Sequence, residues 1–172
     1  MHDELTKVDI LKMKEELESL YARMPELREN VRVTRGFGDL SENDEYKTAK
    51  REINAVKRRT RYLENMIKTA VVIDTAGEEG KTALFDFIHI AYPEPDVESE
   101  EWERRTVRVV TTLRNDVFND CISKESPVGR ALLGRAAGEV VTVSPEGRPS
   151  YLIKIESFEK GEDDPDLPIA AY

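Results

Sequence analysis

Apolar side chains alternate at spacings of three and four residues from residue 10 to residue 31. The positions are Ile10, Met13, Leu17, Leu20, Met24, Leu27 and Val31. This spacing places one apolar stripe along an α-helix, like the a and d positions of a coiled coil. Thr6 and Asp9 have the spacing of an N-cap and its capping-box partner. Pro25 should bend the helix rather than end it, because the stripe continues beyond it.

A second stripe with the same alternation follows in the chain. Its positions are Tyr46, Ala49, Ile53, Val56, Thr60, Leu63, Ile67 and Ala70. Two stripes of matching length joined by a short, glycine-containing segment indicate helices that bury their stripes on each other. Residues 1–74 are therefore predicted to form an antiparallel coiled-coil hairpin. With about 1.5 Å per residue, arms of roughly 27 residues would make a rod of about 40 Å.

The net charge is divided unevenly between the two halves. The 172 residues carry a formal charge of −9, while residues 1–74 hold 15 basic and 15 acidic side chains, so residues 75–172 account for the whole charge. Affinity for nucleic acid comes mainly from Lys and Arg neutralising phosphates, so any such contact should be local. Cys121 is the single cysteine, which excludes an internal disulfide and a cysteine-based zinc site. The absence of a signal pattern or a long apolar run predicts a cytosolic-type chain without a membrane segment.

The segment between the stripes, residues 36–46, is the expected tip of the hairpin. Four carboxylates fall within seven residues there: Asp39, Glu42, Asp44 and Glu45. They could simply start the second helix, with Asp39 or Ser41 as its N-cap. They could also hold a cation or meet a charged partner, because clustered carboxylates repel one another more than a cap requires. Residue chemistry alone leaves both interpretations open.

Basic side chains gather behind the tip on both predicted helices. They are Arg32, Arg35, Lys47, Lys50, Arg51, Lys57, Arg58, Arg59 and Arg61. A solvated helix face is the plain explanation of such a run. In an acidic chain, their concentration beside the tip would also suit guidance of a phosphate backbone towards it.

The second half of the chain is predicted to form a small domain of strands with one short helix. Strands are expected at residues 70–74, 84–91, 106–112, 139–143 and 150–158, each rich in β-branched or aromatic residues. Ser126 and Pro127 favour an N-cap and first position of a helix that Gly134 can end, which makes Ser126 a far better cap than nucleophile. The acidic loop 93–103 with Trp102, and the acidic tail 161–172, look solvated and mobile. No catalytic motif occurs in this half.

These pieces resemble the bacterial GreA/GreB-type transcript cleavage factors of RNA polymerase. The tip matches the signature G-D-L-x-E-N-x-E-Y, and the likeness continues in Ala49, Arg51 and residues 72–74. It returns in residues 126–129 and 131–134, so it covers nearly the whole chain in order. Phe37 stands where better-known members often have histidine, and Asp44 where they have a small residue. A divergent paralogue is one possibility that fits these departures. The tip residues that carry the resemblance are Gly38, Asp39, Leu40, Ser41, Glu42, Asn43, Asp44, Glu45 and Tyr46.

The resemblance implies an α+β chain with three parts. An N-terminal coiled-coil hairpin is followed by an FKBP-like, mostly antiparallel sheet domain at residues 75–160 that docks on the polymerase, and by the acidic tail. The docking region would include Ser126, Pro127, Gly129 and Gly134. The hairpin would enter the secondary channel of the polymerase and stimulate cleavage of backtracked nascent RNA near its 3′ end, so the chain would be an accessory factor and not itself an enzyme.

The resemblance also assigns roles at the tip. Asp39 and Glu42 would be the catalytic pair and would complete a Mg²⁺ site shared with the polymerase, with no metal held tightly by the isolated protein. The logic is that of two-metal phosphodiester hydrolysis. The tip would be positioned by Gly38, Asn43, Asp44, Glu45 and Tyr46. The extruded RNA would be bound by Arg32, Arg35, Lys47, Lys50, Arg51, Lys57 and Arg58.

Two other functions remain open at this stage. One is a non-catalytic regulator that enters the same channel and inhibits or modulates transcription. The other is a coiled-coil interaction module unrelated to transcription, in which the acidic residues only cap a helix. An FKBP-like fold by itself does not imply prolyl isomerisation, because fold alone does not carry activity.

Overall fold

The computed structural model describes residues 3–38, 43–93 and 102–170. These residues divide into two compact units. Residues 10–70 form the first unit, called the hairpin below. Residues 4–9 join the chain from Val71 onward in the second, called the globular unit. In the described ranges, no helix has both the length and the apolar character needed to cross a membrane.

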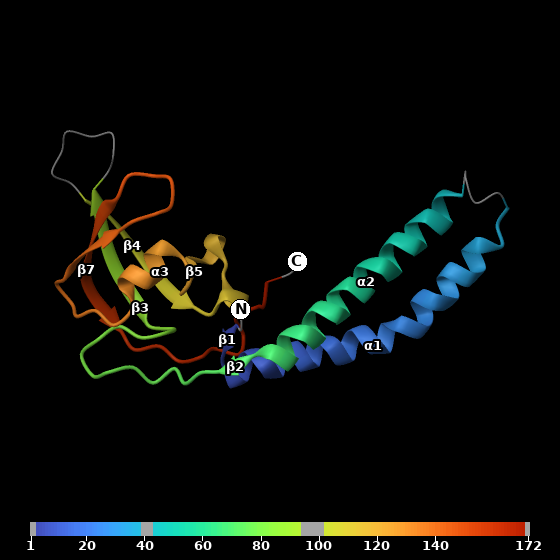
Figure 1. Cartoon of the computed structure of the whole chain (residues 1–172), viewed down its shortest axis with the longest axis horizontal. Coiled ribbons are helices and arrows are strands. Elements are labelled where there is room, and N and C mark those ends of the chain that lie inside the picture. The colour runs from blue at the N-terminus through green and yellow to red at the C-terminus, as the bar shows by residue number, and fades with distance from the viewer. Residues whose placement is uncertain (1–2, 39–42, 94–101, 171–172) are drawn as a thin grey trace. The chain divides into compact units, whose positions relative to one another are not determined.

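Two antiparallel helices, α1 (Lys7–Arg35) and α2 (Asp44–Thr69), build the hairpin (Figure 1). The predicted stripes are its interior. Every stripe position is buried or half-buried, the most enclosed side chains being those of Met13, Leu27, Ala49, Ile53 and Leu63. The predicted coiled-coil hairpin is therefore confirmed.

Polar side chains beside the stripe bond one helix to the other. The Nε and Nη2 atoms of Arg59 donate to the two carboxylate oxygens of Glu16 at 2.6 and 2.8 Å. Arg23 donates to Glu52 at 3.2 Å. Arg59 belongs to the group of basic residues that the sequence places behind the tip, but its guanidinium group pairs with Glu16 of the other helix.

The start of α1 has the capping box that its sequence predicts. The Thr6 hydroxyl accepts from the Asp9 backbone N–H at 3.1 Å, and the Asp9 carboxylate accepts from the Thr6 N–H at 3.0 Å. These two bonds satisfy backbone donors that a helix start leaves free. The helix then continues through Pro25 to Arg35, as the unbroken stripe predicts.

A short parallel ladder joins the segment before α1 to the segment after α2. Strand β1 (Glu4–Leu5) pairs with β2 (Val71–Val72), and the Ile73 N–H donates to the Leu5 carbonyl at 2.9 Å. Leu5 is fully buried. Two residues are too few to show a strand period, so β1 had no signal in the sequence.

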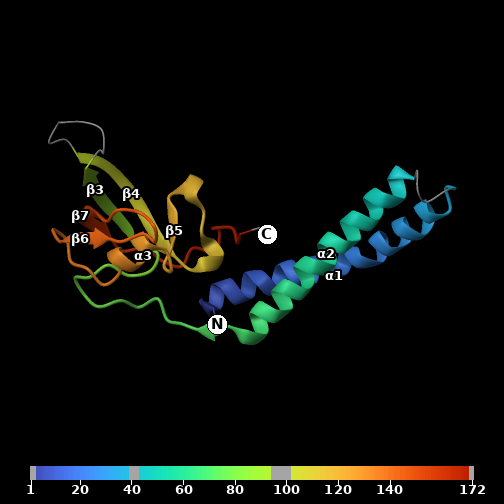
Figure 2. The same cartoon turned by 45° about the horizontal axis from the view of Figure 1, so that its top comes forward.

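The main sheet of the globular unit has five strands in the order β5-β4-β3-β7-β6 (Figure 2). All neighbours are antiparallel except β4 and β5. The predicted mostly antiparallel sheet with one short helix is thus confirmed. The strands are β3 (Phe87–Pro93), β4 (Trp102–Val110), β5 (Cys121–Ser123), β6 (Val140–Val143) and β7 (Tyr151–Glu159).

The strand boundaries differ from the prediction, most of all at the starts of β3 and β4, and β5 was not predicted. Trp102 begins β4 and pairs with Pro93 instead of lying in the acidic loop, of which residues 94–101 lie outside the described ranges. β3 begins at Phe87 and not at residue 84. Phe85 is buried with a φ of +67°, a conformation that strand residues do not adopt. The Asp86 carboxylate accepts from the Ala83 N–H at 2.7 Å and holds this turn.

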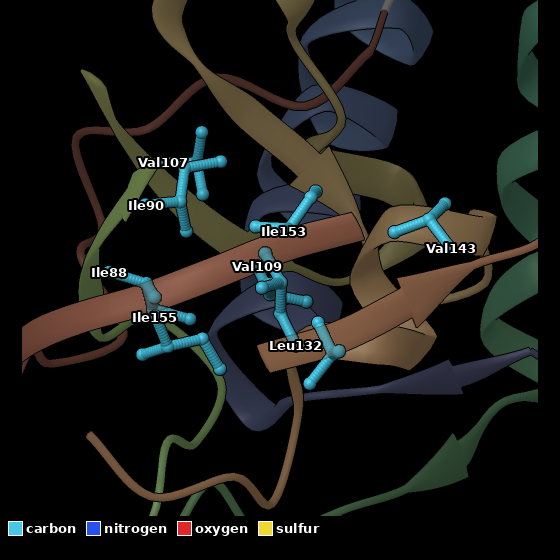
Figure 3. Packing of buried hydrophobic residues seen from close by; sticks show 9 residues of the cluster. Ile88, Ile90, Val107, Val109, Leu132, Val143, Ile153 and Ile155 are labelled. Carbon is cyan, nitrogen blue, oxygen red and sulfur yellow. The ribbon is translucent and has the colours of Figure 1, made fainter. Parts of the chain in front are cut away.

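The core of the globular unit lies between the sheet and the short helix α3 (Pro127–Leu132) (Figure 3). Leu132 is fully buried among sheet residues. The Ser126 hydroxyl accepts from the Gly129 N–H at 3.0 Å, so Ser126 is the predicted N-cap. The cluster consists of Ile88, Ile90, Val107, Val109, Leu132, Val141, Val143, Ile153 and Ile155.

The acidic tail, expected to be solvated and mobile, contacts the globular unit in the described residues 161–170, where its side chains are exposed or half-buried. Its backbone and Asp163 bond to Arg114 at the end of the 3₁₀ turn η1 (Thr112–Arg114). Leu167 packs on a second cluster made by Phe85, Val110 and Cys121. Composition alone could not show this, because it does not reveal which buried cation a carboxylate meets.

Candidate functional site at the hairpin tip

The proposed acidic pair, Asp39 and Glu42, lies outside the residues that the structure describes, as do Leu40 and Ser41. The structure defines both flanks of this segment. Gly38 precedes it with a φ of +116°, a value that glycine adopts without strain. Asn43 follows it at the start of α2. The acidic segment therefore follows Gly38, a residue with few backbone restrictions, and precedes Asn43, a residue that hydrogen bonds hold in place.

Asn43 bonds to both helices of the hairpin. Its Oδ1 atom accepts from the Tyr46 N–H at 2.9 Å, which makes it the N-cap of α2. Its Nδ2 atom donates to the carbonyl oxygen of Thr34 in the last turn of α1 at 2.7 Å. The N-caps considered from the sequence, Asp39 and Ser41, are thus wrong, because α2 begins at Asp44.

Thr34 occupies the next position of the first stripe and is buried. Its hydroxyl donates to the Asn30 carbonyl at 2.7 Å. The position of Thr34 in the stripe predicts that it is buried. The hydrogen bond from Asn43 to the Thr34 carbonyl could not be predicted from the sequence, because the two residues lie on opposite sides of the turn.

Asp44 and Glu45 lie in the first turn of α2 and are exposed. Negative side chains are favourable at this end of a helix, where the backbone N–H groups point outward. Asp44 also lies 3.8 Å from the Lys47 ammonium, its partner three residues on. Helix-start chemistry accounts for these two carboxylates.

A shallow groove of about 480 Å³ runs beside the tip on the hairpin. Val33, Phe37 and Ala49 form apolar parts of its lining, and Asp44, Glu45 and Glu52 contribute carboxylates. The Phe37 side chain is 60% exposed. An aromatic residue with so much exposed surface at the tip is accessible to a partner molecule.

The predicted basic residues differ in whether another side chain of the hairpin lies beside their charged group. Arg32 forms a two-pronged pair with Glu29, at 2.8 and 2.6 Å, which holds the pKa of the Glu29 carboxyl below its usual value. Lys50 lies 5.8 Å from the ring centre of the half-buried Tyr46. Arg32 and Lys47 are thus each beside a carboxylate of their own helix.

The exposed basic face of α2 is formed by residues that recur on one side of the helix. Lys47, Arg51 and Arg58 are spaced by four and seven residues, and Lys50 and Lys57 lie beside them. No ion pair of Arg51, Lys57 or Arg58 occurs among the described residues. Arg35, the last residue of α1, is also exposed. Arg51, Lys57 and Arg58 can therefore meet a polyanion without first breaking an ion pair to another described residue.

The described residues contain no group of three or more His, Cys, Asp or Glu side chains that could hold a metal ion. The acidic pair proposed for Mg²⁺ lies outside that range. Carboxylate oxygens are the donors that Mg²⁺ prefers, so the residue types at Asp39 and Glu42 fit this ion.

The residues predicted to dock a partner surround α3 in the globular unit. Ser126 and Pro127 start the helix, and Gly134 follows its end with a φ of +71°. A Cβ atom at Gly129 would overlap the Ser123 carbonyl oxygen, so this glycine is required by packing. Nearby in the fold, a hollow of about 460 Å³ is lined by Ile90, Tyr92, Val128 and Tyr151 among others. Sequence reasoning did not find this hollow, whose walls come from separate strands, from α3 and from the turn at Val117.

Comparison with known proteins identifies two family segments. Residues 4–72 match the N-terminal domain of the GreA/GreB transcription elongation factors, and residues 96–160 match the C-terminal domain. GreA of Geobacillus kaustophilus is 38% identical over 152 residues, covering 88% of this chain and 92% of that protein. GreA of Clostridioides difficile is 41% identical over 151 residues, covering 87% and 92%.

A similar solved structure is that of GreA factor homolog 1 (Gfh1) from Thermus thermophilus. It shares 24% identity, with a TM-score of 0.42, and the match covers 93% of this chain and all of that one. The two family segments together span most of the chain, and the GreA proteins exceed 30% identity over nearly their full length. The chain therefore belongs to the GreA/GreB family of transcription elongation factors.

Proposed function

We propose that this elongation factor binds bacterial RNA polymerase, inserts the hairpin into its secondary channel and stimulates cleavage of backtracked nascent RNA. The observation that carries the proposal is the position of the G-D-L-x-E-N-x-E-Y signature, between two helices that Asn43 ties together. A slender two-helix arm can carry a short acidic segment to a site that a globular domain cannot enter. Arrested complexes would be rescued because cleavage creates a new RNA 3′ end in register with the polymerase active site.

The reaction is hydrolysis of a phosphodiester by the polymerase's own active site, so the factor is an accessory protein and not an enzyme. Asp39 and Glu42 would hold a Mg²⁺ ion jointly with the polymerase, and the isolated factor would not bind it tightly. Bound there, the ion supplies positive charge to the attacking and leaving oxygens. The two carboxylates then orient the attacking water and accept its proton.

The basic face of α2 supports a role in holding the extruded RNA. Arg51, Lys57 and Arg58 are exposed and face one side, so they are available to the phosphates of a single strand. Lys47, Lys50, Arg32 and Arg35 extend this surface towards the tip. Arg59 is not part of it, because it bonds to Glu16.

The globular unit is proposed to dock on the polymerase through the region of Ser126, Pro127, Gly129 and Gly134. The hollow near α3 and the 99% exposed Phe118 offer apolar surface on the same unit. Exposed apolar surface of this kind commonly marks a protein contact. A factor that acts on bacterial RNA polymerase works in the cytoplasm.

Cleavage of RNA in a stalled elongation complex tests the proposal. Purified factor should speed release of the short 3′ RNA fragment, and the double variant Asp39→Ala, Glu42→Ala should lose this effect while still binding the polymerase. A matched control removes two exposed carboxylates from α1, Glu18→Ala with Glu26→Ala, and should retain full stimulation. Unchanged cleavage with the tip variant would refute the role of the acidic pair.

The alternative, a channel regulator without cleavage activity, is less favoured because relatives at 38%, 40% and 41% identity are named GreA. The same assay separates the two. A regulator would slow nucleotide addition without producing the 3′ fragment. Failure to bind polymerase in a pull-down would instead support an unrelated interaction module.

A further inference from the structure

Arg114 is a fully buried cation in the globular unit, with three hydrogen-bond acceptors around it. Its Nε atom donates to Asp9 Oδ1 at 2.6 Å, Nη1 to the Asp164 carbonyl at 2.6 Å and Nη2 to Asp163 Oδ1 at 2.9 Å. The side chains of Arg114 and Asp9 are both 0% exposed. Because the guanidinium group is planar with donors in fixed directions, this arrangement specifies the places of all three acceptors.

The acceptors come from the two ends of the chain. Asp9 lies in the first turn of α1, where its other carboxylate oxygen accepts from the Thr6 N–H. Asp163 and Asp164 lie in the tail, beyond residue 160, where the matched C-terminal family segment ends. Arg114 therefore connects the start of α1 to a segment outside the matched part of the chain.

The tail is fastened before it reaches Arg114. The buried Asp86 carboxylate accepts from the Gly161 N–H at 3.1 Å and from the Lys160 ammonium at 2.9 Å. The backbone passes so close to the Phe85 carbonyl that a Cβ atom at Gly161 would overlap it. Glycine at this position lets the tail turn onto the surface of η1.

The tail is fastened again after Arg114. Leu167 packs against Phe85, Val110 and Cys121, and the Ala170 N–H donates to the Leu113 carbonyl at 2.7 Å. Because the tail contacts the globular unit both before and after Asp163 in the sequence, the Asp163 carboxylate is held in place beside Arg114.

We propose that residues 161–170 are a strap that closes over Arg114 and holds the first turn of α1 in the globular unit. Helix α1 runs without a break from Lys7 to Arg35, so Asp9 is fixed on the same helix that leads to the tip. The strap residues act through Arg114 and Asp9 and are positioning residues for the first turn of α1. Without the strap, Arg114 loses two of its three acceptors, water reaches its pair with Asp9, and the first turn of α1 opens more often.

Hydrogen exchange of the full-length protein tests the strap directly. The variants are Asp163→Ala, Leu167→Ala and a chain ending after Lys160. The control is Glu162→Ala, which removes an exposed carboxylate of the same tail whose side chain does not contact Arg114. Exchange at residues 4–9 should become at least about tenfold faster in the three strap variants, because protection follows the frequency of local opening. The control should match the wild type.

Two results would overturn the strap. One is unchanged protection at residues 4–9 in both point variants. The other is an equal loss across strands β3 and β7, which would make the tail a general stabiliser of the globular unit. The point variants decide the question if the shortened chain does not fold.

A second measurement rests on the proposed function and is read separately. In stimulated RNA cleavage, Asp163→Ala should raise the factor concentration for half-maximal effect several-fold and leave the rate at saturation unchanged. The reason is that a smaller fraction of molecules holds the binding-competent start of α1. Absence of stimulation by wild-type factor would count against the proposed function, while the exchange data would still decide the strap. A wild-type half-maximal concentration for Asp163→Ala would remove the positioning role.

Discussion

The side chain of Asn43 donates a 2.7 Å hydrogen bond from Nδ2 to the carbonyl oxygen of Thr34 and so links the start of α2 to the end of α1. Helix ends leave backbone donors and acceptors without partners, and this one amide satisfies one group of each kind. The start of α2 is thereby held close to the last turn of α1.

Replacing Asn43 by Ala should destabilise the hairpin by about 1–2 kcal/mol, because both the cap and the tie are lost. Asn43→Asp is the matched control. It keeps an acceptor for the Tyr46 N–H and loses only the donor to Thr34, so a smaller loss is expected. Urea unfolding followed by circular dichroism at 222 nm gives both values. Equal stability of Asn43→Asp and Asn43→Ala would show that the cap contributes nothing measurable.

Arg59 and Arg58 are adjacent in the sequence and should respond differently to replacement by Ala. Arg59 is 11% exposed and grips Glu16 with two hydrogen bonds, so its loss should cost about 1–2 kcal/mol. Arg58 is exposed, and its loss should change stability by less than about 0.5 kcal/mol. Chemical unfolding of the two variants, with a double-mutant cycle on Glu16, measures the difference. A stability ranking in the reverse order would contradict the assignment of Arg59 to the hairpin interior.

Gly129→Ala should destabilise the globular unit by about 1–3 kcal/mol, because the added methyl group has no space against Ser123 and Lys124. Arg130→Ala on the neighbouring exposed position should be nearly neutral. Thermal unfolding checks both. If Gly129→Ala kept the wild-type melting temperature but lost polymerase binding, a docking role and not packing would explain this glycine.

Cys121 should make stability depend on alkaline pH. Burial raises the pKa of its thiol above the ordinary value of 9.0, so the folded state holds this proton more tightly than the unfolded chain does. The contribution is fully present below pH 9.0 and is lost as the pH rises through the raised pKa. Between pH 8 and 10, the free energy of unfolding should fall more steeply for wild type than for Cys121→Ala. Parallel curves would show that the thiol does not titrate differently in the two states.

Much of the hairpin could be predicted because its information is local. Spacings of three and four residues fix which side of each helix is buried, and the capping box at Thr6 and Asp9 involves residues three positions apart. The N-cap of α2 was predicted wrongly because three short polar residues, Asp39, Ser41 and Asn43, compete for that position. The bond from Asn43 across the turn to Thr34 favours the last of them.

The sheet boundaries were predicted less well, for a reason visible at Phe85 and Trp102. Phe85 looks like a strand residue by type but adopts a positive φ in a buried turn held by Asp86. Trp102 follows an acidic run, yet it pairs with Pro93 because the ladder of β3 and β4 extends that far. Strand ends depend on partners that are distant in the chain, and propensity does not contain them.

The sequence by itself determined the hairpin, its inward stripes, the acidic signature at its tip and the family to which they point, since each depends on residue order over short spans. Only the tertiary structure decided which charged side chains are exposed to solvent and which form ion pairs within the fold. Arg58 and Arg59 have the same chemistry, but one meets solvent and the other meets Glu16. Arg114 bonds to Asp9 from 105 positions away, and only folding reveals which buried cation a distant carboxylate will reach.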